Sequence, residues 1–260
     1  MEPLTKYPVV LVHGLVAKNF PFLGAFGIIA DVLRRQGVSV YVTNQDGVGS
    51  ISTNAHQLKA EIEAICRKEN CEKVNIIAHS KGGLDARHMI TALNMQKKVA
   101  SLTTLSTPHH GSKLSASILR FPDWSIHILS LFINGFFRLF GDRNPDIWTA
   151  AKELTDTAME RFNQNTPDHP DVYYQSYSSQ ASKTNAFLVY IPYQISRYCE
   201  QDETDGLVSV QSSQWGNYQG SIDGDLNHIQ IVALTGSKKK RQAVAAFYLH
   251  IITQLRDMGF

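Results

Sequence analysis

The stretch that most constrains the fold runs from Val74 to Gly83 and reads VNIIAHSKGG. Its apolar, β-branched first half is typical of a buried strand, and a helical pattern follows the two glycines. A serine at such a strand–turn–helix junction, with small residues two positions away on each side, predicts a nucleophile elbow. Here Ala78 and Gly82 are the small residues, giving A-x-S-x-G. The tight turn would hold Ser80 in a strained backbone conformation that presents its hydroxyl.

Strands and helices alternate on either side of this stretch. Apolar runs predict strands, and amphipathic runs with a period of about 3.6 residues predict helices. The predicted strands are 9–12, 38–42, 100–106 and 172–177, and the predicted helices are 28–33, 57–67, 83–92 and 241–256. Such alternation predicts an α/β fold, with a mostly parallel sheet and helices on both faces. A length of 260 residues suits a single domain over 1–260.

Composition narrows the class of protein and its setting. With 43% hydrophobic and 18% charged residues and a net charge of +2, neither disorder nor nucleic-acid binding is indicated. The three cysteines, Cys66, Cys71 and Cys199, cannot all pair within one chain. Cys66 lies in helical register with Leu58 and Ile62, so we expect it to pack in the core. The N-terminal residues show no signal-peptide core, and we expect a cytoplasmic location.

An unusually apolar segment follows the strand at 100–106. We place an insertion at 110–171, and within it residues 124–140 read WSIHILSLFINGFFRLF. The segment is too short and too interrupted by polar residues to span a membrane. Two interpretations remain: a buried core helix, or a lid whose apolar face covers a substrate pocket and contacts lipid when open. Under the lid hypothesis the substrate-facing side chains are Trp124, Ile128, Leu131, Phe132 and Phe136.

An acid and a histidine lie further along the chain. Asp205 precedes an apolar turn, and His228 follows a loop rich in glycine and aspartate. The chain order Ser80, Asp205, His228 is one in which a Ser-His-Asp triad occurs. His228 would accept the serine proton, and Asp205 would orient the imidazole ring. Asp205 could equally cap a turn, and spacing alone does not select His228 among ten histidines.

The end of the first predicted strand supplies a further candidate part of the catalytic site. Residues 9–12 end in His13-Gly14-Leu15, and a strand opening into this turn is typical of an oxyanion hole. We expect the backbone N–H groups of Leu15 and Lys81 to be its donors. An ordinary turn at a strand end is the alternative.

Taken together, the chain resembles the bacterial true lipases, the Pseudomonas/Proteus-type triacylglycerol lipases of the α/β-hydrolase superfamily. The resemblance rests on YPVVLVHGL, KVNIIAHSKGG, STPHHGS, DGLVSVQSS and LNHIQIV, between Tyr7 and Thr235. It is this resemblance that selects Asp205 and His228. It implies an α/β-hydrolase fold and hydrolysis of acyl esters through an acyl-enzyme on Ser80. It does not cover the lid in detail, so the helical lid rests on the apolar segment at 124–140.

The chain departs from the family pattern at two positions. Ala78 stands where the family elbow usually begins with glycine. Many members hold calcium with an acid two residues beyond the histidine, where this chain has Gln230, although Asp202 and Asp225 lie nearby in sequence. A neutral amide is a poor replacement for a carboxylate, so we expect no metal and no other cofactor. Some members are exported without a cleaved signal peptide, which is the alternative to a cytoplasmic location.

Three functions follow as hypotheses. The first is a triacylglycerol lipase acting on acyl esters and contacting a lipid interface transiently through its lid. The second is a short-chain carboxylesterase or an acyltransferase on the same fold, and the third is a non-catalytic hydrolase-like binding protein. The presence of all three candidate triad residues argues against the third, and no nucleic acid is expected as a partner.

Overall fold

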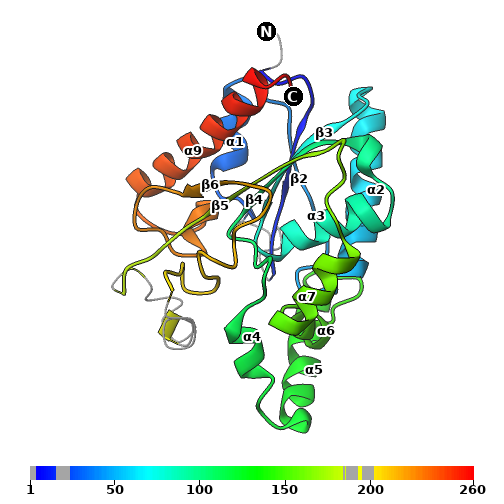
Figure 1. Cartoon of the computed structure of the whole chain (residues 1–260), viewed down its shortest axis with the longest axis vertical. Helices are drawn as coiled ribbons and strands as arrows, with labels where there is room; N and C mark the ends of the chain where they lie inside the picture. The colour runs from blue at the N-terminus through cyan, green and yellow to red at the C-terminus, as the bar shows by residue number, and fades with distance from the viewer. Residues whose placement is uncertain (1–3, 16–23, 184, 186–192, 195–201) are drawn as a thin grey trace.

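A parallel sheet organises the protein, whose computed structural model describes residues 4–15, 24–183, 185, 193–194 and 202–260. The described residues form a six-stranded sheet in the order β2-β1-β3-β4-β5-β6, with every pairing parallel (Figure 1). Its strands are β1 (Val9–Val12), β2 (Val40–Val42), β3 (Val74–His79), β4 (Val99–Leu105), β5 (Tyr173–Ser178) and β6 (Asn217–Ser221). The predicted parallel sheet is therefore confirmed.

Helices cover both faces of this sheet. On one face lie α1 (Ile29–Arg35) and α9 (Lys238–Asp257), and on the other lie α2 (Ile51–Glu69) and α3 (Lys81–Ala92) (Figure 1). Successive residues of a strand point to opposite faces. Ile77 of β3 accordingly packs in the cluster with α1 and α9, and Ile76 packs in the cluster with α2 and α3. A central strand buried on both sides must be apolar along its length, and VNIIAH nearly is.

Capping residues set the ends of two helices beyond the predicted bounds. Ser50 accepts a hydrogen bond from the N–H of Thr53, so α2 begins at Ile51 rather than at residue 57. Ser237 caps α9 in the same way through Lys240, so the basic run from Lys238 forms its first turn. Cys66 is buried among the α2 side chains that face the sheet, as expected. Cys199 lies outside the described residues.

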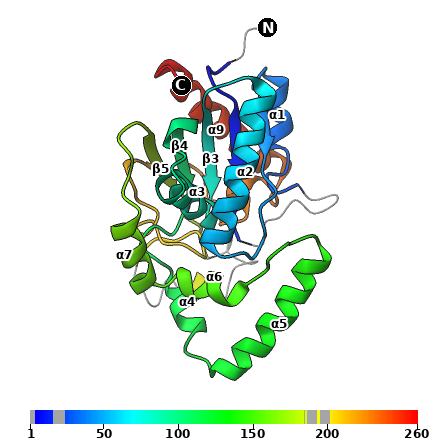
Figure 2. The ribbon, with the colours of Figure 1, turned by 90° about the vertical axis from the view of Figure 1, so that its right-hand side faces the viewer.

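The segment between β4 and β5 is helical. It contains α4 (Lys113–Ile118), α5 (Asp123–Leu139), α6 (Ile147–Glu153) and α7 (Asp156–Asn165), all within the range 110–171 that we treat as an insertion. Figure 2 shows α5 at the outer end of the molecule, beyond α4 and α6. Two short 3₁₀ helices are formed by Gln96–Lys98 and by Gln230–Val232.

The interpretation of α5 as a buried core helix is wrong. Phe132 is 74% exposed and Trp124 is 69% exposed, whereas the side chains of α5 that are buried are Ile126, Ser130 and Phe137. The lid hypothesis predicts that the apolar face covers a substrate pocket, whereas that face is exposed among the residues that the structure describes. No helix in the described part of the chain has the length and hydropathy needed to cross a membrane.

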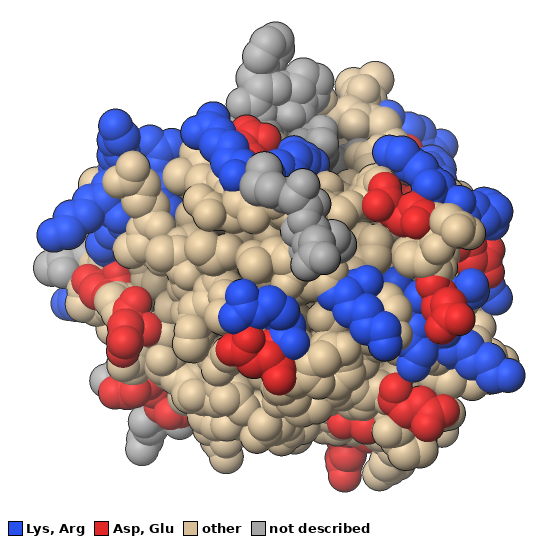
Figure 3. Space-filling view, turned by 90° about the horizontal axis from the view of Figure 1, so that it is seen from above, with Lys and Arg blue, Asp and Glu red and all other residues tan. Residues whose placement is uncertain are grey.

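The face of the molecule that lies opposite the insertion carries charges of both signs. Figure 3 views this face, and Lys and Arg side chains alternate there with Asp and Glu side chains and with uncharged surface. Nucleic-acid binding needs a continuous basic surface that neutralises phosphates. This face does not provide such a surface.

Candidate active site

Ser80 occupies a sharp turn between β3 and α3. Its backbone has φ 54° and ψ −135°, a left-handed region that non-glycine residues rarely adopt. A Cβ atom added at Gly82 would lie 2.4 Å from the carbonyl oxygen of His13, and one added at Gly14 would lie 2.5 Å from Cβ of Ser80. These close approaches require glycine at both positions, because the turn after β1 packs directly on the elbow.

The structure brings the three predicted triad side chains together. Nε2 of His228 lies 2.9 Å from Oγ of Ser80, and Nδ1 of His228 lies 2.7 Å from Oδ2 of Asp205. The other carboxylate oxygen of Asp205 accepts hydrogen bonds from the N–H groups of Leu207 at 3.0 Å and Val208 at 2.9 Å. One carboxylate oxygen is thus fixed by the DGLV turn, and the other faces the imidazole ring.

Electrostatics keeps Asp205 ionised. Burial by itself raises the pKa of this carboxyl group, but the neighbouring His228 and the two backbone N–H donors outweigh it and leave the pKa below its ordinary value. An ionised Asp205 can only accept, so Nδ1 of His228 must carry a proton. Nε2 is then free to accept the proton of Ser80 while the ring is neutral.

The candidate oxyanion donors lie on the two segments that meet at the elbow. Lys81 is the first residue of α3, and the N–H groups in the first turn of a helix have no acceptor within the helix. Leu15 follows Gly14, whose added Cβ would lie 3.1 Å from Oγ of Ser80. Both backbone segments therefore approach the serine hydroxyl, as an oxyanion hole requires.

The comparisons with known proteins show the family of the chain. A model of the palmitoyl protein thioesterase family matches residues 8–191. The chain belongs to the palmitoyl protein thioesterase family. Triacylglycerol lipase 2 of Saccharomyces cerevisiae is 32% identical over 251 residues, which cover 88% of this chain and 72% of that protein. The triacylglycerol lipase of Burkholderia plantarii is 32% identical over 178 residues, covering 63% of this chain and 49% of its own length. The predicted resemblance to triacylglycerol lipases is confirmed.

Solved structures show the shared fold. Staphylococcus hyicus lipase superposes with a TM-score of 0.77 at 18% identity, over 98% of this chain and 96% of that chain. A metagenomic carboxyl esterase superposes with the same TM-score, 0.77, at 19% identity, over 95% of this chain and 76% of that chain. The α/β-hydrolase fold expected from the resemblance to bacterial lipases is confirmed for this thioesterase-family chain.

The predicted lid side chains do not line the triad in this structure. Trp124, Leu131 and Phe132 are exposed on α5, as are Ile128 and Phe136. Leu131, Phe132 and Phe136 border a shallow apolar depression formed by residues of α5 alone. The apolar surface is therefore presented to solvent and is separate from the residues around Ser80.

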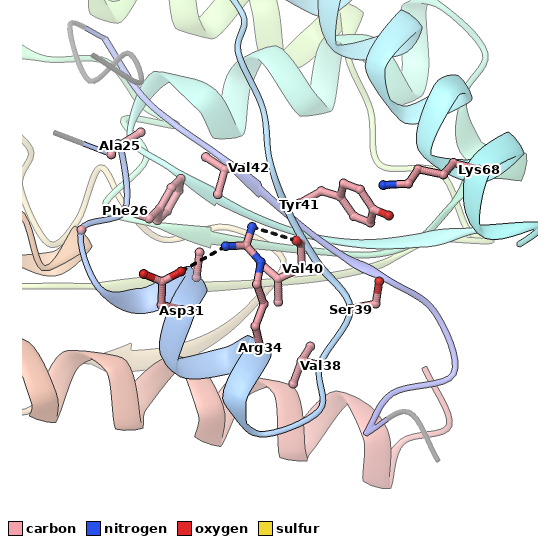
Figure 4. Close-up of a pocket in the computed structure, with 13 residues that line it drawn as sticks. Ala25, Phe26, Asp31, Arg34, Val38, Ser39, Val40, Tyr41, Val42 and Lys68 are labelled. Carbon is pink, nitrogen blue, oxygen red and sulfur yellow. Dashed lines mark hydrogen bonds and ion pairs between the residues drawn. The ribbon is translucent and has the colours of Figure 1, made fainter. Parts of the chain in front are cut away.

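A cavity elsewhere is unconnected with the triad. About 730 Å³ of space lies between α1 and the edge strand β2, and its lining includes Arg34, Asp31 and Tyr41 (Figure 4). The Arg34 guanidinium donates to Asp31 at 3.2 Å and to the carbonyl oxygen of Val40 at 3.2 Å. Because these groups already satisfy one another, we assign no ligand to this cavity.

Gln230 is already engaged in hydrogen bonds within the protein. Its Oε1 accepts from the side-chain amide of Asn185 at 2.7 Å, and its Nε2 donates to the Asn185 Oδ1 at 3.0 Å. Asp225 accepts from the N–H of Ser182 at 2.6 Å and from its hydroxyl at 2.7 Å. Among the described residues, no group of three or more His, Cys, Asp or Glu side chains is arranged to hold a metal ion. These donors do not fit a calcium site in their present arrangement.

Two buried histidines near the site were missed by the sequence reasoning. His79 packs against the candidate catalytic ring, with 4.5 Å between its centroid and that of His228. His109 accepts from Arg87 through Nδ1 at 3.2 Å and bonds Thr104 through Nε2 at 3.0 Å. Burial lowers the pKa of both rings well below the ordinary value, with further lowering from His228 and Arg87 respectively. The one signal in the sequence was the position of His79 directly before the serine, and His109 had none.

These histidines predict a loss of stability in mild acid. The unfolded chain protonates them near pH 6.5, whereas the fold keeps them neutral, so the unfolded state holds more protons below that pH. The free energy of unfolding should be constant from pH 8 to about 6.5 and then fall by up to about 1.4 kcal/mol per pH unit per histidine. Urea unfolding from pH 8 to 5 measures this, with the exposed His127→Gln as the control that leaves the profile unchanged. A flat profile over that range would contradict it.

Proposed function

We propose that the protein is a serine ester hydrolase whose substrates are lipid acyl esters, with triacylglycerols as the favoured class. The observation that carries this proposal is the hydrogen-bonded series of Ser80, His228 and Asp205 at a strand–helix elbow. The triacylglycerol lipases to which the chain is about 32% identical support the substrate class. The chain covers 54% and 49% of the two bacterial lipases of this group, so the activity of the complete proteins enters here as part of the proposal.

The proposed reaction proceeds in two halves. Ser80 attacks the ester carbonyl while His228 takes its proton, and Asp205 stabilises the resulting imidazolium. The N–H groups of Leu15 and Lys81 stabilise the negative charge on the tetrahedral oxygen. Collapse releases the alcohol, which receives the proton from His228, and leaves the acyl group on Ser80. Water then attacks the acyl-enzyme by the same route and releases the fatty acid.

A second candidate is hydrolysis of acyl thioesters. It is favoured by the match to the palmitoyl protein thioesterase family over residues 8–191. The same nucleophile, base and oxyanion donors would serve, because a thioester differs only in its leaving group. The two candidates therefore differ in substrate preference and share one set of catalytic residues.

One substrate panel separates these functions. Rates are measured on nitrophenyl esters from acetyl to palmitoyl, on emulsified triacylglycerol and on a palmitoyl thioester, with and without glycerol as acceptor. We expect turnover of triacylglycerol and a preference for long acyl chains. Preference for acetyl esters indicates a carboxylesterase. If glycerol accelerates the loss of substrate but not the release of free carboxylic acid, the protein is an acyltransferase. Preference for the thioester favours the second candidate. No turnover of any substrate would contradict both proposals.

The exposed face of α5 is proposed to contact lipid during turnover. The double variant with Phe132→Ser and Phe136→Ser should hydrolyse emulsified long-chain esters about tenfold more slowly. Its rate on soluble short-chain esters should change little. Each large apolar side chain transferred from water contributes roughly 1.5–3 kcal/mol, so two of them strongly affect adsorption. Because both side chains are exposed, the melting temperature should stay within a few degrees of the parent.

A matched control is available at the other end of the molecule. Met258 is also an exposed large apolar residue, and Met258→Ser should leave both rates unchanged. Equal losses on both kinds of ester, or a collapsed melting temperature in the α5 variant, would contradict a role in lipid contact.

We propose that catalysis needs no calcium and no cofactor. Incubation with a chelator should leave both turnover and the melting temperature unchanged. The support is that the Gln230 amide and the Asp225 carboxylate are engaged by Asn185 and Ser182. A large loss of activity that calcium restores and magnesium does not would overturn this proposal.

The proposed location is the cytoplasm, with export without a cleaved signal peptide as the alternative. Cys66 and Cys71 are free thiols, which supports a reducing compartment. Detection of the protein in the medium of intact cells would favour the alternative.

A further inference from the structure

A buried ion pair directly follows the candidate nucleophile. Nζ of Lys81 lies 2.6 Å from Oδ1 of Asp85, one helical turn further along α3, and each side chain is only 1% exposed. Lys81 is also the residue whose backbone N–H is a proposed oxyanion donor. The reaction described above uses that N–H and assigns no task to the charged side chain.

Helix stability does not explain this pair. A lysine in the first turn faces the positive end of the helix dipole, and a lysine N-terminal to its acid is the less favourable order at this spacing. Taking both charges out of water costs several kcal/mol, which a buried pair often fails to recover. Burial accordingly raises the pKa of Asp85, against the opposing effects of Lys81 and Asn54. A role in positioning accounts for a pair that helix stability disfavours.

The pair is joined to the base of the insertion by a short series of hydrogen bonds. The side-chain amide of Asn54 donates to Oδ2 of Asp85 at 3.0 Å and to the carbonyl oxygen of Asp46 at 3.0 Å. The carboxylate of Asp46 accepts from the backbone N–H groups of Arg143 at 2.8 Å and Asn144 at 2.7 Å. These last two residues lie in the connection between α5 and α6.

The same connection is fixed to the core at a further point. The N–H of Asp146 donates to the carbonyl oxygen of Val48 at 2.9 Å, and the N–H of Val48 donates to Oδ2 of Asp142 at 3.1 Å. Residues on both sides of Arg143 and Asn144 therefore hold the loop that contains Asp46. Asn54 and Asp46 therefore link two parts of the structure by hydrogen bonds. One part is the first turn of α3, and the other is the connection between α5 and α6.

We propose that Lys81 and Asp85 are positioning residues for the oxyanion donor, and that Asn54 and Asp46 tie them to the base of the insertion. The ion pair fixes the first turn of α3, and with it the direction of the Lys81 N–H. Asn54 and Asp46 make that direction depend on the connection between α5 and α6. The inference rests on the proposed ester hydrolysis, because an oxyanion donor has a function only in acyl transfer.

The test removes both charges together. Single substitutions leave an unpaired buried charge and destabilise the fold, whereas replacing both partners with apolar residues of similar volume is often neutral. We expect Lys81→Met with Asp85→Leu to keep the parental melting temperature and KM on a soluble ester. Its kcat should fall about 10- to 100-fold, somewhat less than the loss of a whole oxyanion donor. Inhibition by an alkyl boronic acid, which forms a tetrahedral anion on Ser80, should weaken by a similar factor.

A second variant covers the case in which the double variant does not fold. Asn54→Ala keeps the ion pair and removes only its link to Asp46. We expect kcat to fall several-fold at constant KM, and inhibition by the boronic acid to weaken by a similar factor. An active parent whose folded variants retain parental kcat and boronic acid inhibition would overturn this inference alone. A parent that hydrolyses no ester or thioester would overturn the proposed function and this inference with it.

Discussion

Replacing Ser80 with alanine should lower kcat on nitrophenyl esters by about a million-fold when the chemical step is rate-limiting. The substitution removes the hydroxyl that Nε2 of His228 contacts at 2.9 Å, so no acyl-enzyme forms. Alanine has the same backbone preferences as serine to a first approximation, so the turn with φ 54° is preserved. The melting temperature should therefore remain close to that of the parent.

A buried serine on the neighbouring strand provides the matched control. The hydroxyl of Ser101 in β4 donates to the side chain of Asn75 at 2.8 Å. Ser101→Ala should cost about 1 kcal/mol of unfolding free energy and leave turnover unchanged. Turnover near the parental rate in a purified Ser80→Ala variant would show that another residue is the nucleophile.

Replacing Asp205 with asparagine should lower kcat by about ten thousand-fold, the size of effect that the same change has in the Ser-His-Asp template. An amide can donate to Nδ1 of His228, which favours the tautomer with the proton on Nε2. That ring nitrogen then cannot accept the proton of Ser80. The side-chain carbonyl can still accept from Leu207 and Val208, so we expect the fold to persist.

Asp202 provides the matched control for the substitution of Asp205. Its carboxylate accepts from the N–H of Gln211 at 2.9 Å, and Asp202→Asn should leave kcat and KM unchanged. Both variants are measured on the same soluble ester, beside their melting temperatures. A loss of less than about tenfold for Asp205→Asn in a folded protein would mean that Asp205 does not orient the catalytic ring.

The elbow could be predicted from local sequence because the pattern that is typical of it lies within one short stretch. A strand buried on both faces must be apolar, and a turn as tight as the one at Ser80 must have small neighbours, so both requirements are visible between Val74 and Gly83. Asp205 and His228 are different. They reach Ser80 only when the sheet is assembled, with His228 separated from it by 148 positions, and only the family resemblance selected them.

Other features depended on tertiary contacts that no sequence pattern contains. The pattern of α5 fits a covered or an uncovered apolar face equally well, and the structure leaves Phe132 exposed. Strand β6 has the polar sequence NYQGS and lacks the apolar alternation that predicts a strand. Lys81 and Asp85 have the spacing of a solvated surface pair, and they become a buried pair only through the packing around α3.

Acid-quench mass spectrometry during turnover tests whether Ser80 carries the acyl group. The purified protein is mixed with a nitrophenyl ester, quenched within one turnover, digested and mapped. We predict one acyl group per chain, on the peptide that contains Ser80, and no adduct on that peptide in the Ser80→Ala variant. An acyl group on a different residue, or steady turnover with neither an adduct nor a burst of nitrophenol, would contradict this mechanism.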